Sequence, residues 1–158
     1  MDGVIVARVL HVLAVVIWIG GLATVTTVVL PAVRRGELGA DRLGAFAAIE
    51  RGFIWQARTA IIIVGATGFY MVVEADLWDR FRDAEFWWMD AMVGLWTLFA
   101  IGLFAVEPLI LERNLCRWAT TDPDGTFKWL QRAHWILLAL SLVTVCGAVA
   151  GSHGWSVS

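Results

Sequence analysis

The sequence lacks the residue patterns on which many soluble catalytic sites are built. It contains no GxSxG, P-loop, HExxH or CxxC pattern, so the hydrolase, nucleotide-binding, zinc-protease and dithiol sites that use these patterns are excluded. The haem-attachment pattern CxxCH is also absent, and any haem would therefore be bound non-covalently, as b type. The two cysteines, Cys116 and Cys146, are expected about a membrane apart, so we expect no disulfide between them.

Charge is also scarce, and apolar residues take its place. Charged residues make up only 16% of the 158 residues and the formal net charge is −2, which leaves no basic footprint for nucleic acid. Hydrophobic residues make up 59% and the mean hydropathy is +0.74, values typical of an integral membrane protein. The N-terminus has no cationic region before its apolar run, so we expect a retained first helix and not a cleaved signal peptide.

Four apolar runs, at about 4–30, 53–73, 87–111 and 130–150, are each long enough to cross a bilayer. The linkers between them are short, and Asp41 is a plausible cap for a short helix that runs into the second span. The third linker carries the turn sequence TTDPDGT. We therefore expect an all-α protein: a single domain over 1–158, folded as an up-down bundle of four transmembrane helices.

Basic residues are distributed unevenly among the linkers. The first and third linkers, with the entry to the fourth span, hold Arg34, Arg35, Arg42, Arg51, Arg113, Arg117, Lys128 and Arg132. The second linker has two arginines among five acidic residues. The positive-inside rule places the first and third linkers in the cytoplasm and both termini on the periplasmic side. We expect a multi-pass protein of the bacterial inner membrane, surrounded by lipid; a second copy or other membrane proteins are its candidate partners.

Polar residues at membrane depth form an outer layer near the termini. His11, in the first span, and Met92, in the third, should both lie roughly 8–10 Å below the outer boundary, and Trp18 shares the face of His11 two turns further in. His153 should lie just above this layer. Imidazole and thioether are ligands of low-spin haem and of soft copper, so His11 and Met92 are candidate metal ligands, and His153 and Trp18 are further candidates for cofactor binding. The alternatives are a core histidine bonded to a carbonyl or to Asp90, and a methionine that fills space.

A second polar layer is expected near the cytoplasmic face. Arg58, Glu107 and His134 reach the same depth when the spans are threaded antiparallel. Such a cluster could hold propionates, relay protons or form a structural ion pair. Small residues also recur in the spans, as in GAVAG at 147–151 and at Gly65, Gly68, Gly94 and Gly102, and they predict seams where helices approach closely.

The residues LHVLAVVIWIGGL at 10–22 resemble the first helix of the CopD-type copper-resistance membrane proteins. They are equally similar to the HemJ-type protoporphyrinogen oxidases, small helical haem proteins, whose later helices have the same layout as IERGFIWQARTAIIIVGATGFYMV, FWWMDAMVGL and FKWLQRAHWILL. The resemblance implies that His11 is the functional histidine of that helix and that Trp18 belongs to its tryptophan motif. The HemJ type has an important lysine where this chain has Met92, which argues against porphyrinogen oxidation and leaves haem ligation open. The methionine-rich outer segments expected of a copper supplier are absent.

Three hypotheses follow. The first is a b-type haem protein of the membrane, for electron transfer or porphyrin redox chemistry, with iron held by His11 and by Met92, His153 or another residue. The second is copper handling of the CopD type through His11 and nearby methionines. The third is a structural or assembly subunit of a larger membrane complex, with no cofactor.

Overall fold

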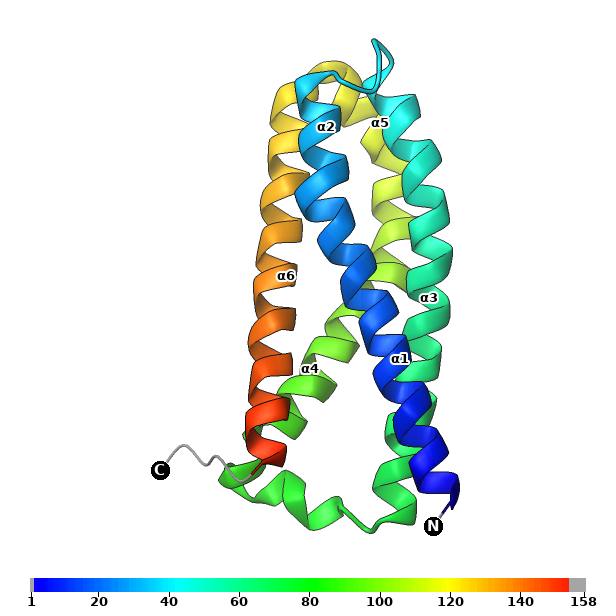
Figure 1. Cartoon of the computed structure of the whole chain (residues 1–158). Helices are drawn as coiled ribbons and strands as arrows, with labels where there is room; N and C mark the ends of the chain where they lie inside the picture. The colour runs from blue at the N-terminus through cyan, green and yellow to red at the C-terminus, as the bar shows by residue number, and fades with distance from the viewer. Residues whose placement is uncertain (1, 154–158) are drawn as a thin grey trace.

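A computed structural model of the chain describes residues 2–153, and four long helical rods dominate this part (Figure 1). The first rod is continuous through α1 (Asp2–Thr24), the π-helical segment η1 (Val25–Val29) and α2 (Leu30–Arg35). The second is α3 (Arg42–Glu74). Two 3₁₀ segments, η2 (Trp78–Arg82) and η3 (Ala84–Phe86), lead to the third rod, made of α4 (Trp87–Ile101), the π-helical η4 (Gly102–Leu111) and α5 (Glu112–Thr121). The fourth is α6 (Pro123–Ser152).

Successive rods run in opposite directions, so the start of α1 and the end of α6 lie at one end of the bundle (Figure 1). We call this the termini end; the opposite end is where α2 stops and α3 and α6 begin. In the described part of the chain, four helices have the length and composition to cross a membrane: Gly3–Arg35, Arg42–Glu74, Ala84–Leu111 and Pro123–Ser152. The expected all-α fold is confirmed at this level, and it indicates a multi-pass membrane protein.

Capping residues set the helix ends at the opposite end of the bundle. The Asp41 side chain accepts a hydrogen bond from the Gly44 amide at 2.9 Å, and Asp122 accepts one from Gly125 at the same distance, which satisfies amides left free in the first turns of α3 and α6. Gly36, at φ +74°, ends α2 in a left-handed conformation that only glycine adopts at no steric cost. The expected Asp41 cap is found, and α3 continues from it into the second span without a break.

The third linker turns within the sequence TTDPDGT, as expected, but most of the linker is helical. Residues 112–121 form α5, which continues the third rod to within two residues of α6. Leu115 and Ala119 of α5 are buried four residues apart on one face, as an amphipathic helix requires. Leu115 joins a hydrophobic cluster at the opposite end with Val29, Leu30, Phe46 and Phe127. Burial of this face explains why the segment is helical.

A second cluster lies mid-bundle and joins three of the rods. Trp18 from α1, Val64 from α3, and Leu95 and Phe99 from α4 are all buried there. Large apolar side chains on the outward faces are more than half exposed, among them Val16 and Ile136, both at 62%. A soluble protein has no reason to expose so many, whereas a bilayer solvates them.

The glycine seams receive aromatic side chains and not helix backbones. A Cβ at Gly65 would come within 2.6 Å of the Trp96 ring, one at Gly147 within 2.5 Å of Trp87, and one at Gly151 would overlap Trp88. The GAVAG stretch of α6 thus seats two tryptophans from the start of α4. The seam expected at Gly94 and Gly102 is wrong, because a Cβ there would meet nothing within 4 Å.

Candidate functional site

His11 is held by α3 in one defined tautomer. Its Nδ1 lies 3.0 Å from Oγ1 of Thr67, and that hydroxyl donates its own proton to the Ile63 carbonyl at 2.6 Å. A hydroxyl has a single proton, so when Thr67 donates to Ile63 it accepts from His11, and the imidazole proton is then on Nδ1. Nε2 then carries the free lone pair. This is the arrangement that a histidine ligand of a metal uses, with its other nitrogen bonded to an acceptor.

Gly68 lets the imidazole come this close to α3. A Cβ at Gly68 would lie 3.3 Å from Cε1 of His11, which is tighter than ordinary van der Waals contact. The ring therefore rests on a glycine surface, with Thr67 beside it. Asp90, the acidic partner considered for a core histidine, is exposed on α4. The partners described for His11 are Thr67 and the backbone of Val64, both on α3, so the alternative of a histidine bonded to a carbonyl also has a partner in the structure.

Met92 occupies the same layer as His11 on a different helix. It lies four residues before Trp96, and therefore one turn nearer the termini end on the same face of α4. Trp96 donates to the Ile61 carbonyl of α3 at 2.9 Å, so this face of α4 is directed at α3. His11 and Met92 are thus each about one turn from the mid-bundle cluster, at matched depth.

The structure does not bring the two side chains into a described contact. The contacts of His11 are with α3. Toward its first residue α4 diverges from α1 and approaches α6 (Figure 1), where Trp87 and Trp88 pack on Gly147 and Gly151. His11 and Met92 therefore lie in the part of the bundle where the pair α1 and α3 separates from the pair α4 and α6.

The other two candidates for cofactor binding have different surroundings. Trp18 is buried at 5% exposure, with its ring edge-on to Phe99 at a centroid distance of 4.7 Å. Its Nε1 has no hydrogen-bond partner among the described residues, which is costly for a buried donor. His153 is exposed just after the end of α6, and its Nδ1 lies 2.8 Å from the Val149 carbonyl of the same helix.

In the inner layer the structure brings Arg58 and Glu107 together. Arg58 Nη2 lies 2.6 Å from Glu107 Oε2, and the guanidinium also donates from Nε and Nη2 to the Leu103 carbonyl, at 3.1 and 2.9 Å. Rings on either helix flank the cation: its carbon lies 5.7 Å from the centroid of Trp55 and 5.8 Å from that of Phe104. Hydrogen bonds and ring faces together satisfy the cation at membrane depth.

The Leu103 carbonyl is available because of a proline. In the π-helical segment η4 each carbonyl bonds the amide five residues on, and the residue five after Leu103 is Pro108, which has no N–H. The same happens in η1, where the Leu30 amide already bonds Val25 and the residue five after Thr26 is Pro31. There the buried Gln131 side chain donates to the Thr26 carbonyl at 2.6 Å. A polar side chain from another helix satisfies each orphaned carbonyl.

His134 has its own bond within α6. Its Nδ1 lies 2.9 Å from the Leu130 carbonyl, and since a carbonyl only accepts, the proton is again on Nδ1. A further acidic side chain, Glu50 of α3, is partly buried and interacts electrostatically with Glu107. The pair of Arg58 and Glu107 is therefore the part of the expected inner cluster for which direct contacts are described.

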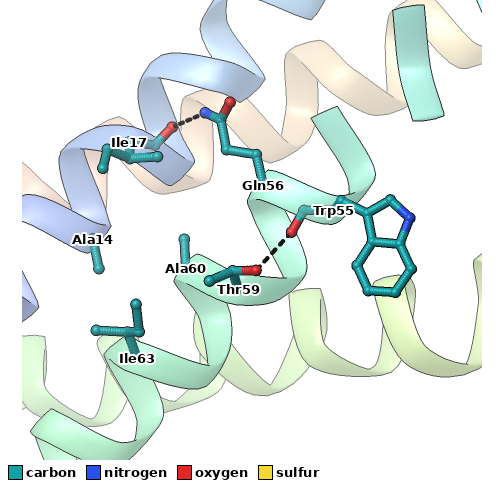
Figure 2. A pocket seen from close by; sticks show the side chains of 7 residues that line it. All are labelled: Ala14, Ile17, Trp55, Gln56, Thr59, Ala60 and Ile63. Carbon is teal, nitrogen blue, oxygen red and sulfur yellow. Dashed lines mark hydrogen bonds between the residues drawn. The ribbon is translucent and has the colours of Figure 1, made fainter. Parts of the chain in front are cut away.

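A groove on the surface of α1 and α3 includes neither His11 nor Met92 among the residues that line it. Its lining is Ala14, Ile17, Trp55, Gln56, Thr59, Ala60 and Ile63. Figure 2 shows Gln56 donating across it to the Ile17 carbonyl, at 3.2 Å, and Thr59 bonding the Trp55 carbonyl of its own helix, at 3.0 Å. The Trp55 ring points away from the groove (Figure 2). None of the lining side chains titrates in the physiological range, so the groove offers no acid–base chemistry.

Sequence reasoning missed Thr67, the residue that fixes the tautomer of His11. Its only signal in the sequence is a hydroxyl in an otherwise apolar stretch of the second span. Among the described residues, no three His, Cys, Asp or Glu side chains gather where they could hold a metal ion.

Comparisons of the chain with protein-family models, with curated protein sequences and with solved structures give no match. The resemblance of residues 10–22 to the CopD-type and HemJ-type proteins therefore stays a prediction.

Proposed function

We propose that this chain is a membrane electron-transfer protein that binds a b-type haem near the termini end, with Nε2 of His11 as an axial ligand. The hydrogen bond from His11 to Thr67 carries the proposal. It fixes the ring, leaves the lone pair on Nε2, and raises the basicity of the ligand nitrogen. A buried imidazole needs a partner for its N–H in any case, so what the ligand role adds is the use of the lone pair on Nε2.

The residues on either side of His11 in α1 are apolar, as an apolar macrocycle requires. Two turns further in, the buried Trp18 has an N–H donor with no partner among the described residues. Met92 is the second residue that we propose to hold the iron, since residue counting gives it the depth of His11 and its face of α4 is directed at α3, the helix on which His11 packs. A haem with histidine and methionine ligands exchanges single electrons at a raised potential.

The orientation in the membrane is part of the same proposal. The opposite end of the bundle carries Arg34, Arg35, Arg42 and Lys128, whereas the linker at the termini end is rich in acidic residues. By the positive-inside rule the opposite end is cytoplasmic. The haem would then lie toward the periplasmic side of a bacterial inner membrane.

The inner layer supports a structural role and not a second cofactor site. Arg58 is bonded to Glu107 and to the Leu103 carbonyl and is flanked by two rings. A cation satisfied in this way has little capacity left for haem propionates.

The test is the cofactor content of the protein purified in detergent. We expect a Soret band, a reduced α band and a positive pyridine haemochrome, with iron and without stoichiometric copper. Copper without haem would support the copper-handling hypothesis. Neither metal, together with co-purifying subunits, would support a structural subunit, and either result would overturn the haem proposal.

A further inference from the structure

A polar pocket at the opposite end of the bundle lies apart from both polar layers. It is lined by Pro31, Arg34 and Arg35 from α2, and by Asp124 and Lys128 from the first turns of α6. Its volume is about 390 Å³, far more than the roughly 30 Å³ that one water molecule occupies in the liquid. Arg42, at the start of α3, reaches over Gly36 to bond Asp124 at 3.0 Å. Three helix ends therefore meet around this pocket.

The charges around the pocket do not cancel. Asp124 is paired with Arg42, and Arg35 is paired with Glu37. The hydrogen bond from Arg35 lowers the pKa of the Glu37 carboxyl, so this pair stays ionised at neutral pH. Arg34 and Lys128 have no ion-pair partner within residues 2–153. Two cations therefore remain uncompensated, and both are exposed.

The pocket lies where a membrane-spanning apolar surface gives way to charge. Val28, three residues before Pro31, is 59% exposed, and Trp129, next to Lys128, is 54% exposed. Trp129 packs edge-on against Trp118 of α5 at a centroid distance of 6.5 Å. Exposed tryptophans next to basic residues are typical of the head-group level of a bilayer. Acyl chains would meet Val28 and its neighbours, and the head group would meet the pocket.

We propose that this pocket binds the phosphate of an anionic phospholipid, with Arg34 and Lys128 as its principal cations. Basic pockets between transmembrane helices recognise phosphate-bearing head groups in this way, through charge-assisted hydrogen bonds. Free phosphate offers the same oxyanion, but the apolar surface next to the pocket and its head-group position commit the site to a lipid. The site is independent of the haem and would exist without it.

The test measures lipid binding to the full chain purified in detergent. The protein is titrated with phosphatidylglycerol, phosphatidylcholine or inorganic phosphate, and native mass spectrometry gives the bound fraction at each concentration. Each cation near an anionic head group is worth about fivefold in affinity, so Arg34→Gln with Lys128→Gln should weaken phosphatidylglycerol binding about 25-fold. A matched double change in the linker at the termini end, Arg80→Gln with Arg82→Gln, should leave it unchanged. Phosphatidylcholine should bind weakly to every variant.

Asp124→Asn should increase the affinity for the lipid, and a gain in affinity cannot be explained by a variant that fails to fold. The substitution removes a carboxylate and releases Arg42, so phosphatidylglycerol should bind about fivefold more tightly. Circular dichroism of each variant is the control that its helices are kept. The proposal is overturned if both double variants lose affinity equally, if phosphatidylcholine binds the wild-type chain as tightly as phosphatidylglycerol, or if free phosphate binds with the affinity of the anionic lipid.

Discussion

Arg58 donates two hydrogen bonds to the carbonyl of Leu103, five residues before Pro108. Gln131 does the same with one bond to Thr26, five residues before Pro31. Pro108 removes an amide inside the π-helical η4, and Pro31 removes one just after the π-helical η1. Each freed carbonyl would be an unsatisfied acceptor inside the membrane. The Arg58 and Gln131 side chains thus replace the missing backbone hydrogen bonds and also link two rods, so the stability of the bundle depends on them.

The first prediction concerns the asymmetry of the inner ion pair. Arg58→Ala should lower the free energy of unfolding by about 2–4 kcal/mol, because it removes the cation bonded to Glu107 and leaves the Leu103 carbonyl without its side-chain donor. Glu107→Ala should cost less, about 1–2 kcal/mol, because Arg58 keeps its bonds to Leu103 and the repulsion from Glu50 disappears. Unfolding in detergent measures both. If Arg58→Ala and Glu107→Ala lower the free energy of unfolding equally, the hydrogen bonds from Arg58 to the Leu103 carbonyl contribute nothing to stability.

The second prediction isolates the role of Pro31. Gln131→Leu orphans the buried Thr26 carbonyl and should cost about 1–3 kcal/mol. In a Pro31→Ala background, residue 31 regains an amide that can bond that carbonyl, so the same Gln131→Leu change should cost less than half as much. A double-mutant cycle on unfolding free energies measures the coupling. If the two changes in unfolding free energy simply add, Gln131 does not compensate for the amide that Pro31 lacks.

The third prediction uses the glycines. Gly65→Ala drives a methyl group into the Trp96 ring and should cost about 1–3 kcal/mol by overpacking. Gly94→Ala, on the neighbouring helix and in open space, is the matched control and should be neutral or slightly stabilising, since alanine favours a helix. If both changes have the same effect on the melting temperature in detergent, the described packing of Trp96 on Gly65 is wrong.

The fourth prediction concerns topology. Cys116 lies on α5 at the opposite end and is exposed, so a membrane-impermeant thiol reagent should label it only from the cytoplasmic side. Cys146 is also exposed on the protein surface, but it lies within the fourth candidate span and lipid should shield it from either side. Labelling of Cys116 in intact cells would reverse the proposed orientation.

Residue counting predicts depth in this protein but not the direction that a side chain faces. The rise per residue places Arg58 and Glu107 in one layer, and the structure joins them. Residue counting cannot say which way His11 faces, because α1 is almost entirely apolar and has no polar face to orient it. The bond to Thr67 depends on how α1 packs on α3, and that packing is decided by local shape, at Gly68 above all.

Two other features were readable in part. Leu115 and Ala119, four residues apart among polar neighbours, carry the amphipathic pattern of α5, so that helix could have been predicted. The side-chain hydrogen bonds to the Leu103 and Thr26 carbonyls could not have been predicted, because sequence alone does not show that the helix changes to a π-helical pattern before each proline. Without that change, the orphaned carbonyl would be expected four residues before the proline and not five.

The central claim is that His11 is a haem ligand fixed by Thr67. The decisive measurement is haem content and reduced-minus-oxidised absorption of wild-type protein and four variants purified in detergent. His11→Ala should lose the haem and Met92→Ala should shift the spectrum and the potential, because axial ligands set both. Thr67→Val should weaken haem retention about 10–100-fold, as loss of a bond that orients a metal ligand does, and His134→Ala should change nothing. Wild-type protein without haem, or a His11→Ala variant with a full and unshifted spectrum, would contradict the account.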